Sequence, residues 1–163
     1  MKALVFSDSH GRLDNLLDVL KQHPDYEAIF HLGDIEGDED RLRSLTPYPV
    51  YMVRGNCDFY SHCQDMLTVD WQGKHIVMCH GHRYLNYGGI ETLRYLAEQE
   101  KADIVMFGHT HVPVIESIDG KTFVNPGSIS KPRQERKIPT YIMMNSDADG
   151  NVTFELYEYA RSR

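Results

Sequence analysis

The stretch Val5-Phe6-Ser7-Asp8-Ser9-His10-Gly11 lies near the start of a chain of 163 residues. The apolar run Ala3–Phe6 predicts a buried strand, and Gly11 permits a turn into a following helix. Asp8 and His10 come directly after this strand. Because ligands of open α/β sheets bind beyond the carboxyl ends of the strands, the pair lies where such proteins build their functional sites.

Four later apolar runs end in side chains of the same kind. The runs at residues 28–32, 50–53, 75–78 and 104–107 each precede a carboxylate, a carboxamide or an imidazole beside a glycine, which permits a tight turn. The polar residues that follow these runs are Asp34, Asn56, His80, and His109 with His111. The repetition, rather than any single pair, indicates one shared site.

Helices are expected between the early strands and before the run at 104–107. Leucines at 13, 16, 17 and 20 fall on one face of an amphipathic helix that ends near His23. A short helix is expected at 41–45. A longer helix is expected after Gly88-Gly89, with its inner face at positions 90, 93, 96 and 97.

Turn signals predict hairpins in the remainder of the chain. Runs 66–71 and 75–78 flank Gly73, runs 112–118 and 122–124 flank Asp119-Gly120, and runs 140–144 and 152–159 flank Asp149-Gly150. The first half alternates strand and helix, whereas the last third is mostly strand. We therefore expect an α/β fold over residues 1–163 as a single domain, a two-sheet β-sandwich of mixed sheets flanked by helices.

Composition excludes several classes of function. The formal net charge of −7, from 24 acids and 17 bases, argues against non-specific binding to nucleic acid or to a membrane surface. No apolar stretch approaches the roughly 18 residues of a membrane span, and we expect no secretion signal. Three cysteines without a C-x-x-C spacing predict neither a disulfide framework nor a zinc ribbon, so a cytoplasmic location is expected.

Carboxylate, imidazole and carboxamide groups together are the ligand set of a mixed nitrogen and oxygen metal site. Seven candidate ligands are too many for one ion and suit two, with Asp34 as the natural bridge. Two ions about 3.5–4 Å apart can hold a hydroxide and clamp a phosphoryl group for displacement. Taken alone, each residue has a simpler explanation, such as a strand cap, a turn residue or a solvent-facing histidine. Membership in the whole set favours metal binding.

At these residues the chain resembles the calcineurin-like metallophosphoesterases. The short chain, the Gly-Asn-Cys-Asp variant and Asn125-Pro126-Gly127-Ser128 resemble the small bacterial and archaeal YfcE-like phosphodiesterase branch of that family. The motifs that carry the resemblance, in chain order, are Asp8-x-His10, Gly33-Asp34, Gly55-Asn56-Cys57-Asp58, His80-Gly81-His82, Gly108-His109-Thr110-His111 and Asn125-Pro126-Gly127-Ser128.

The resemblance implies a four-layer sandwich around a dinuclear metal centre that hydrolyses a small phosphodiester by attack of a metal-bound hydroxide. Two divalent transition-metal ions are implied, with manganese expected and nickel, iron, cobalt or zinc as alternatives. Homo-dimers or tetramers are common in the family. One ion would bind Asp8, His10, Asp34 and His111, and the other would bind Asp34, Asn56, His80 and His109.

Cys57 departs from the family pattern. The asparagine is usually followed by a histidine that contacts the phosphate and protonates the leaving group. A neutral thiol is a weaker hydrogen-bond donor than imidazole, and its pKa is higher. We expect Asn56 and Cys57 to contact the substrate, and Asp58, which normally orients the missing histidine, to complete the catalytic group. The hypothesis is a preference for esters with good leaving groups, such as aryl phosphodiesters.

Other functions remain open on the same residues. A binding scaffold of the retromer type would have lost ligands, whereas every ligand position here is filled. A phosphomonoesterase or protein phosphatase usually carries longer insertions than this chain has. The basic segment 131–137 either leans over a phosphate or is a solvated loop, and His82 either approaches the substrate or is a plain loop residue.

Overall fold

The computed structural model describes residues 1–161, whose strands form two five-stranded sheets. The strands are β1 (Lys2–Phe6), β2 (Ala28–His31), β3 (Val50–Met52), β4 (Met66–Trp71), β5 (Lys74–Cys79), β6 (Ile104–Met106), β7 (Pro113–Ile118), β8 (Lys121–Pro126), β9 (Thr140–Ser146) and β10 (Val152–Glu158). The first sheet has the order β10-β9-β1-β2-β3, and the second has the order β4-β5-β6-β8-β7.

Both sheets combine parallel and antiparallel pairs of strands. β1, β2 and β3 run parallel, and so do β5, β6 and β8, whereas β9, β10, β4 and β7 pair antiparallel with their neighbours. Register brings Phe6 beside His31 and His31 beside Met52. The parallel strands of a sheet therefore end together, which gathers the loops that follow them.

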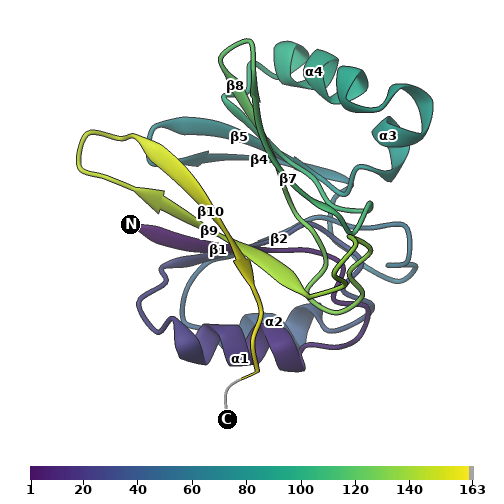
Figure 1. The fold of residues 1–163 in the computed structure, drawn as a ribbon, viewed down its shortest axis with the longest axis vertical. Helices are drawn as coiled ribbons and strands as arrows, with labels where there is room; N and C mark the ends of the chain where they lie inside the picture. The colour runs from purple at the N-terminus through teal and green to yellow at the C-terminus, as the bar shows by residue number, and fades with distance from the viewer. Residues whose placement is uncertain (162–163) are drawn as a thin grey trace.

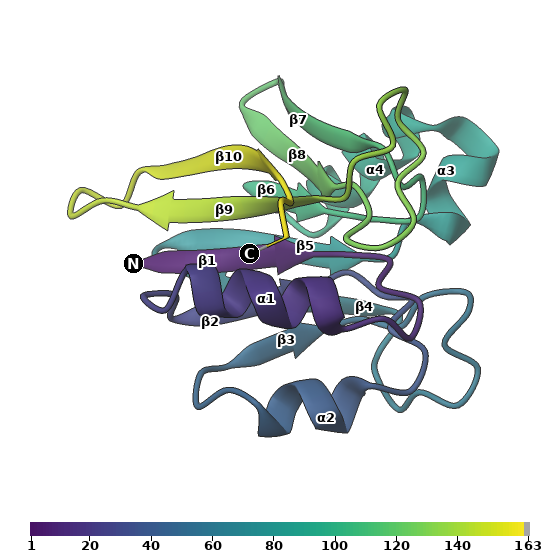
Figure 2. The same ribbon diagram turned by 60° about the horizontal axis from the view of Figure 1, so that its bottom comes forward.

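Four helices cover the outer faces of the sheets: α1 (Asp14–Gln22), α2 (Glu39–Ser44), α3 (His82–Gly88) and α4 (Ile90–Gln99). α1 and α2 lie on one side of the molecule, and α3 and α4 lie on the other (Figures 1 and 2). The result is a four-layer arrangement of helix, sheet, sheet and helix. The α/β sandwich of mixed sheets expected from the sequence is confirmed.

Three apolar clusters separate these layers. Phe30 and Met78 belong to the cluster between the two sheets, Leu16 to the one under α1, and Leu93 to the one under α4. All four side chains are fully buried. Because burying one such side chain contributes about 1.5–3 kcal/mol, the sheets form a rigid base for the loops at their ends.

One helix was not predicted from the sequence. α3 follows Gly81 directly, and none of its residues is fully buried, so it lacks the apolar stripe that reveals a helix. Gly81, at φ 102°, makes the left-handed turn into it. Within residues 1–161, no helix has the length and apolar character needed to cross a membrane.

Candidate metal centre

The loops after the strands hold five of the seven predicted ligands in left-handed backbone conformations. Such conformations are uncommon outside glycine and cost on the order of 1 kcal/mol each, so their clustering marks a functional site. They recur in pairs two residues apart: Asp8 (φ 55°) and His10 (48°), Asp34 (55°) and Glu36 (58°), and His109 (68°) and His111 (59°). His109 and His111 therefore lie on a left-handed turn.

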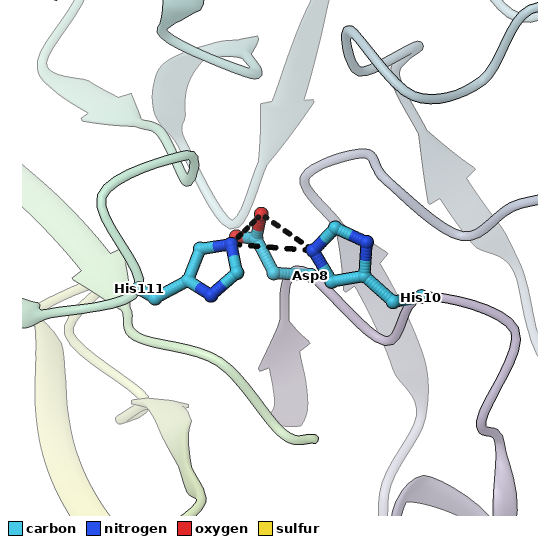
Figure 3. Close-up of side chains that lie close together, drawn as sticks. All are labelled: Asp8, His10 and His111. Carbon is cyan, nitrogen blue, oxygen red and sulfur yellow. Dashed lines mark hydrogen bonds and ion pairs between the residues drawn. The ribbon is translucent and has the colours of Figure 1, made fainter. Parts of the chain in front are cut away.

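Asp8, His10 and His111 form the first cluster of the centre (Figure 3). His111 Nε2 lies 3.1 Å from Asp8 Oδ1 and 3.2 Å from His10 Nε2. The Oδ1 atom of Asp8 is buried and accepts no hydrogen bond among the described residues. A buried acceptor without a donor is costly unless a cation or a proton occupies the space before it.

The tautomers of His10 and His111 also favour a cation in front of the Asp8 oxygen. His10 Nδ1 lies 2.6 Å from Glu36 Oε1, and His111 Nδ1 lies 2.6 Å from the Lys131 carbonyl oxygen. Since both partners are acceptors, each Nδ1 carries a proton, and in the neutral ring each Nε2 presents a lone pair. Two lone pairs and the Asp8 oxygen thus face one another, which is the arrangement that a bound metal ion requires.

A second group lies beside the first and shares Asp8. Asp34 Oδ2 is 3.4 Å from His80 Nε2 and 3.8 Å from His10 Nε2, so Asp34 lies between the two clusters. His80 Nδ1 lies 2.7 Å from the Leu32 carbonyl, which directs its Nε2 toward the carboxylates. Asp8, Asp34 and His80 bring three ligand atoms within 4.8 Å of one another.

Asn56 and His109 complete this second group. Asn56 Oδ1 is 3.1 Å from His80 Nε2 and 3.0 Å from His109 Nδ1. The backbone N–H of His109 also donates to Asp8 Oδ2 at 3.1 Å. All seven predicted ligands are therefore brought together, in two groups joined through Asp8 and Asp34.

The charges of the site suit a cation. Burial raises the pKa of Asp8, but contacts with His111 and His80 outweigh it, and the pKa lies below its usual value. The pKa of Asp34 is likewise lowered by His80 and the Cys57 N–H in spite of burial. Both carboxylates are therefore ionised at neutral pH, as metal ligands must be.

Asp58 lies behind the metal ligands. Its Oδ2 accepts the N–H groups of Asp34 at 2.7 Å and Gly55 at 2.8 Å, and its Oδ1 accepts that of Glu36 at 2.7 Å. This buried carboxylate joins the loops after β2 and β3. The catalytic role expected for Asp58 stays a prediction, and the geometry gives the residue a positioning role.

Cys57 lies at the rim of the centre. Its N–H donates to Asp34 Oδ1 at 2.8 Å, and its sulfur accepts from Asn56 Nδ2 at 3.3 Å. Burial and the neighbouring Asp34 raise the pKa of the thiol to about 11. The thiol is therefore neutral at neutral pH.

Several residues of the site were not found by sequence reasoning. Glu36, which binds His10, belongs to an acidic run that resembles the start of a helix. Ser128 and Ser130 donate to the Asp8 carbonyl oxygen at 2.7 and 3.0 Å and hold its left-handed turn. The resemblance named the segment containing Ser128, but no local signal in the sequence distinguishes these serines.

The basic segment 131–137 contacts the centre through its backbone. Besides the Lys131 carbonyl, the Arg133 N–H donates to the His111 carbonyl at 3.1 Å. Burial and His80 lower the pKa of His109, and the charge of Arg133 adds to this effect. Arg136, in contrast, pairs with Glu158 at 2.7 Å. His82 packs beside His80 and His109, with ring centroids 5.5 and 6.1 Å away, outside both ligand groups.

Known proteins share both the sequence and the fold. A probable metallophosphoesterase of Bacillus subtilis, YsnB, is 35% identical over 161 residues, which cover 98% of this chain and 92% of that protein. The crystal structure of a conserved protein from Streptococcus pneumoniae, described as a predicted phosphoesterase, superimposes with a TM-score of 0.82 at 29% identity, covering 99% of this chain and 92% of the other.

Two further solved structures share the fold at lower identity. Vps29 of Entamoeba histolytica, solved with zinc, has a TM-score of 0.77 at 24% identity and covers 98% of this chain and 100% of its own. An archaeal phosphodiesterase has a TM-score of 0.73 at 21% identity, over 96% of this chain and 100% of its own. Residues 1–149 match the calcineurin-like phosphoesterase superfamily domain. The chain therefore belongs to the calcineurin-like phosphoesterase superfamily.

Proposed function

We propose that this protein hydrolyses phosphodiesters by means of two divalent transition-metal ions, with manganese as the expected ion and nickel, iron, cobalt or zinc as alternatives. The observation that carries the proposal is the convergence of the Asp8 oxygen and the Nε2 atoms of His10 and His111 on one point, within 3.2 Å of His111 Nε2. Asp8, His10, Asp34 and His111 would hold one ion. Asp34, Asn56, His80 and His109 would hold the other.

When bound, two such ions supply a nucleophile at neutral pH and neutralise charge on the phosphoryl group. The chain's own residues orient the site. Glu36 and the carbonyls of Leu32 and Lys131 fix the ring nitrogens that face the ligands, and Asp58 holds Asp34 in place. Asn56 and the neutral Cys57 thiol stand at the rim, where the substrate enters.

A diester suits this rim better than a monoester for an electrostatic reason. Glu36 and the acidic pair of Asp34 and Asp58 surround Cys57, where the family usually has a histidine. A phosphodiester carries one negative charge, whereas a monoester carries up to two and so needs more compensation. An archaeal protein of the same fold is described as a phosphodiesterase, which supports the proposal by analogy.

Parallel assays with p-nitrophenyl phosphate and bis-p-nitrophenyl phosphate test the proposal. The protein is stripped with a chelator and supplied in turn with manganese, nickel, cobalt or zinc. We expect metal-dependent release of nitrophenol, faster from the diester. Faster turnover of the monoester would instead indicate a phosphomonoesterase or protein phosphatase. Metal binding without turnover of either ester would favour an interaction scaffold like Vps29, whose fold this chain shares.

A further inference from the structure

Two aromatic side chains stand beside the metal centre almost fully exposed. Phe59 is 82% exposed and Tyr60 is 96% exposed. Both follow Asp58, whose carboxylate is fixed by backbone N–H groups and whose carbonyl accepts the Ser61 N–H at 3.2 Å. Since the turn is held on both sides of the two rings, they are presented to solvent by an ordered loop.

A cavity of about 410 Å³ lies beside these rings, a size typical of sites for small molecules. Glu36 and Cys57 line it together with Phe59 and Tyr60. The same Glu36 binds His10 Nδ1 at 2.6 Å, and the Cys57 N–H binds Asp34 Oδ1 at 2.8 Å. The cavity therefore begins at residues that contact the candidate metal ligands.

The charge of the cavity restricts its occupant. Glu36, Glu39 and Asp58 line it, and no lysine, arginine or histidine is among its lining residues in the described part of the chain. Such a wall repels a phosphate chain or a departing phenolate, both of which are anionic. A neutral ring, in contrast, can stack on exposed aromatic faces.

We propose that this cavity binds a neutral aromatic group of the phosphodiester substrate, namely the ester group that stays on the phosphate after hydrolysis. The departing group, which becomes an anion, would leave on the side away from Glu36 and Glu39. This inference rests on the proposed function, because it places the phosphate at the metal centre. It defines the substrate class as diesters with one neutral aryl or nucleobase-like substituent.

The test compares two diesters that release the same p-nitrophenolate and differ only in the retained group, which is phenyl in one and methyl in the other. The wild-type protein should prefer the phenyl diester in kcat/KM. In F59A/Y60A this preference should fall about tenfold, since stacking on an aromatic side chain typically contributes about that much. Y87A is the matched control, because Tyr87 is 89% exposed on α3 and lines no part of this cavity. Its preference should equal that of the wild type.

A charge variant gives an independent readout. A diester that retains a 4-carboxyphenyl group should be hydrolysed more slowly than the phenyl diester, because its carboxylate meets the acidic wall. E39Q should reduce the ratio of the phenyl rate to the 4-carboxyphenyl rate several-fold, since it removes one charge from the wall. An unchanged difference in E39Q would contradict the assigned charge selection.

The failures of the two proposals are distinguishable. If the wild-type protein hydrolyses both diesters but F59A/Y60A keeps the full phenyl preference, the aromatic site is wrong and the phosphodiesterase remains. If the wild-type protein with metal hydrolyses neither diester, the proposed function fails and the aromatic site fails with it. If sedimentation shows that F59A/Y60A changes the assembly state while the preference is unchanged, the rings contact a second copy of the chain, and the proposal is overturned.

Discussion

Cys57 stands where the resemblance implied a histidine, and its surroundings define what that difference means. The thiol lies among Asp34, Glu36 and Asp58, which together with burial raise its pKa to about 11. A thiol of this pKa keeps its proton at neutral pH and donates only a weak hydrogen bond. It is therefore a poor proton source for a basic leaving group.

The replacement C57H tests this interpretation. An imidazole beside the same carboxylates can donate a strong hydrogen bond, so C57H should raise turnover of alkyl diesters more than that of nitrophenyl diesters. General acid catalysis typically accelerates a reaction 10²–10⁴-fold. We therefore expect C57H to raise turnover of alkyl diesters at least about tenfold more than turnover of nitrophenyl diesters. Steady-state kinetics on both ester classes measure it. An equal effect on both classes would show that position 57 does not control proton transfer.

Asp58 gives a second prediction for a single residue. An asparagine has one side-chain oxygen in place of two, so D58N should leave at least one of the three buried N–H donors unpaired. We expect the free energy of unfolding to fall by about 1–3 kcal/mol. Denaturant unfolding of the chelated protein measures it, with D149N on the exposed β9–β10 turn as control. A loss of activity without loss of stability would instead favour a direct catalytic role.

The ends of the strands determine the geometry of the centre, and His31 at the end of β2 is an example. His31, the last residue of β2, is buried, and its Nδ1 accepts the Gly33 N–H at 3.3 Å while its Nε2 faces Ser9 Oγ at 3.1 Å. A protonated ring could not accept the Gly33 N–H. Burial is the main reason that the pKa of His31 lies at about 4, below the ordinary 6.5.

This arrangement predicts an acid-sensitive β2. Because the pKa of His31 is lower in the folded protein than in the unfolded chain, the unfolded chain binds the proton first as the pH falls. Stability is therefore full above pH 6.5 and declines as the pH falls toward 4. The decline approaches about 1.4 kcal/mol per pH unit for this one group. H31N retains an acceptor for the Gly33 N–H. Its free energy of unfolding, measured by urea unfolding of the chelated protein, should therefore decline less steeply as the pH falls. H62N, at an exposed loop position, should match the wild type, and equal declines in all three proteins would contradict the prediction.

The loop after β6 is packed against the loop after β1. A Cβ atom added at Gly108 would lie 2.0 Å from Ser7 Oγ and 2.9 Å from Asp8 Oδ2. G108A should therefore displace Asp8 and weaken metal affinity by at least about tenfold, because a displaced carboxylate alters the geometry of the ligands. Calorimetric titration with manganese measures the affinity. G120A is the control, because a Cβ atom added at Gly120 meets nothing within 4 Å. Equal manganese affinities of G108A and G120A would contradict the packing argument.

The positions of these elements were largely predictable, and their local geometry was not. Each ligand follows an apolar run, and the continuous apolar character and the neighbouring glycines made those runs visible. Glu36 was missed because an acidic residue before a short helix has an ordinary explanation as a helix start. The left-handed turn at His109 depends on tertiary contacts such as its N–H to Asp8 Oδ2, which no local pattern encodes. α3 was missed because it buries no complete side chain.

On the scale of the whole molecule, the centre joins the two sheets. Asp8 and Asp34 follow strands of the first sheet, whereas His80, His109 and His111 follow strands of the second. A bound cation would therefore crosslink the sandwich, and its binding free energy would add to the stability of the fold.

Metal-dependent stabilisation follows from this geometry. At a manganese concentration one hundred times the dissociation constant, one site adds about 2.7 kcal/mol to the free energy of unfolding. Thermal unfolding with and without manganese should show a clear rise of Tm in the wild type and a smaller rise in D8N, because Asp8 is a proposed ligand of one of the two ions and its carboxylate also lies near Asp34 and His80. D149N should show the wild-type rise. A similar rise in D8N would mean that the ion binds elsewhere.

The measurement that tests the central claim most directly counts bound metal and turnover in the same sample. Chelator-stripped protein is titrated with manganese while bound ions per chain and hydrolysis of bis-p-nitrophenyl phosphate are recorded, for the wild type and D34N. We expect turnover in the wild type to appear as two ions bind, and we expect D34N, which lacks the charge between the two groups, to lose turnover together with at least one ion. Full turnover in D34N, or wild-type turnover without added metal after complete stripping, would contradict a dinuclear metal-dependent phosphodiesterase.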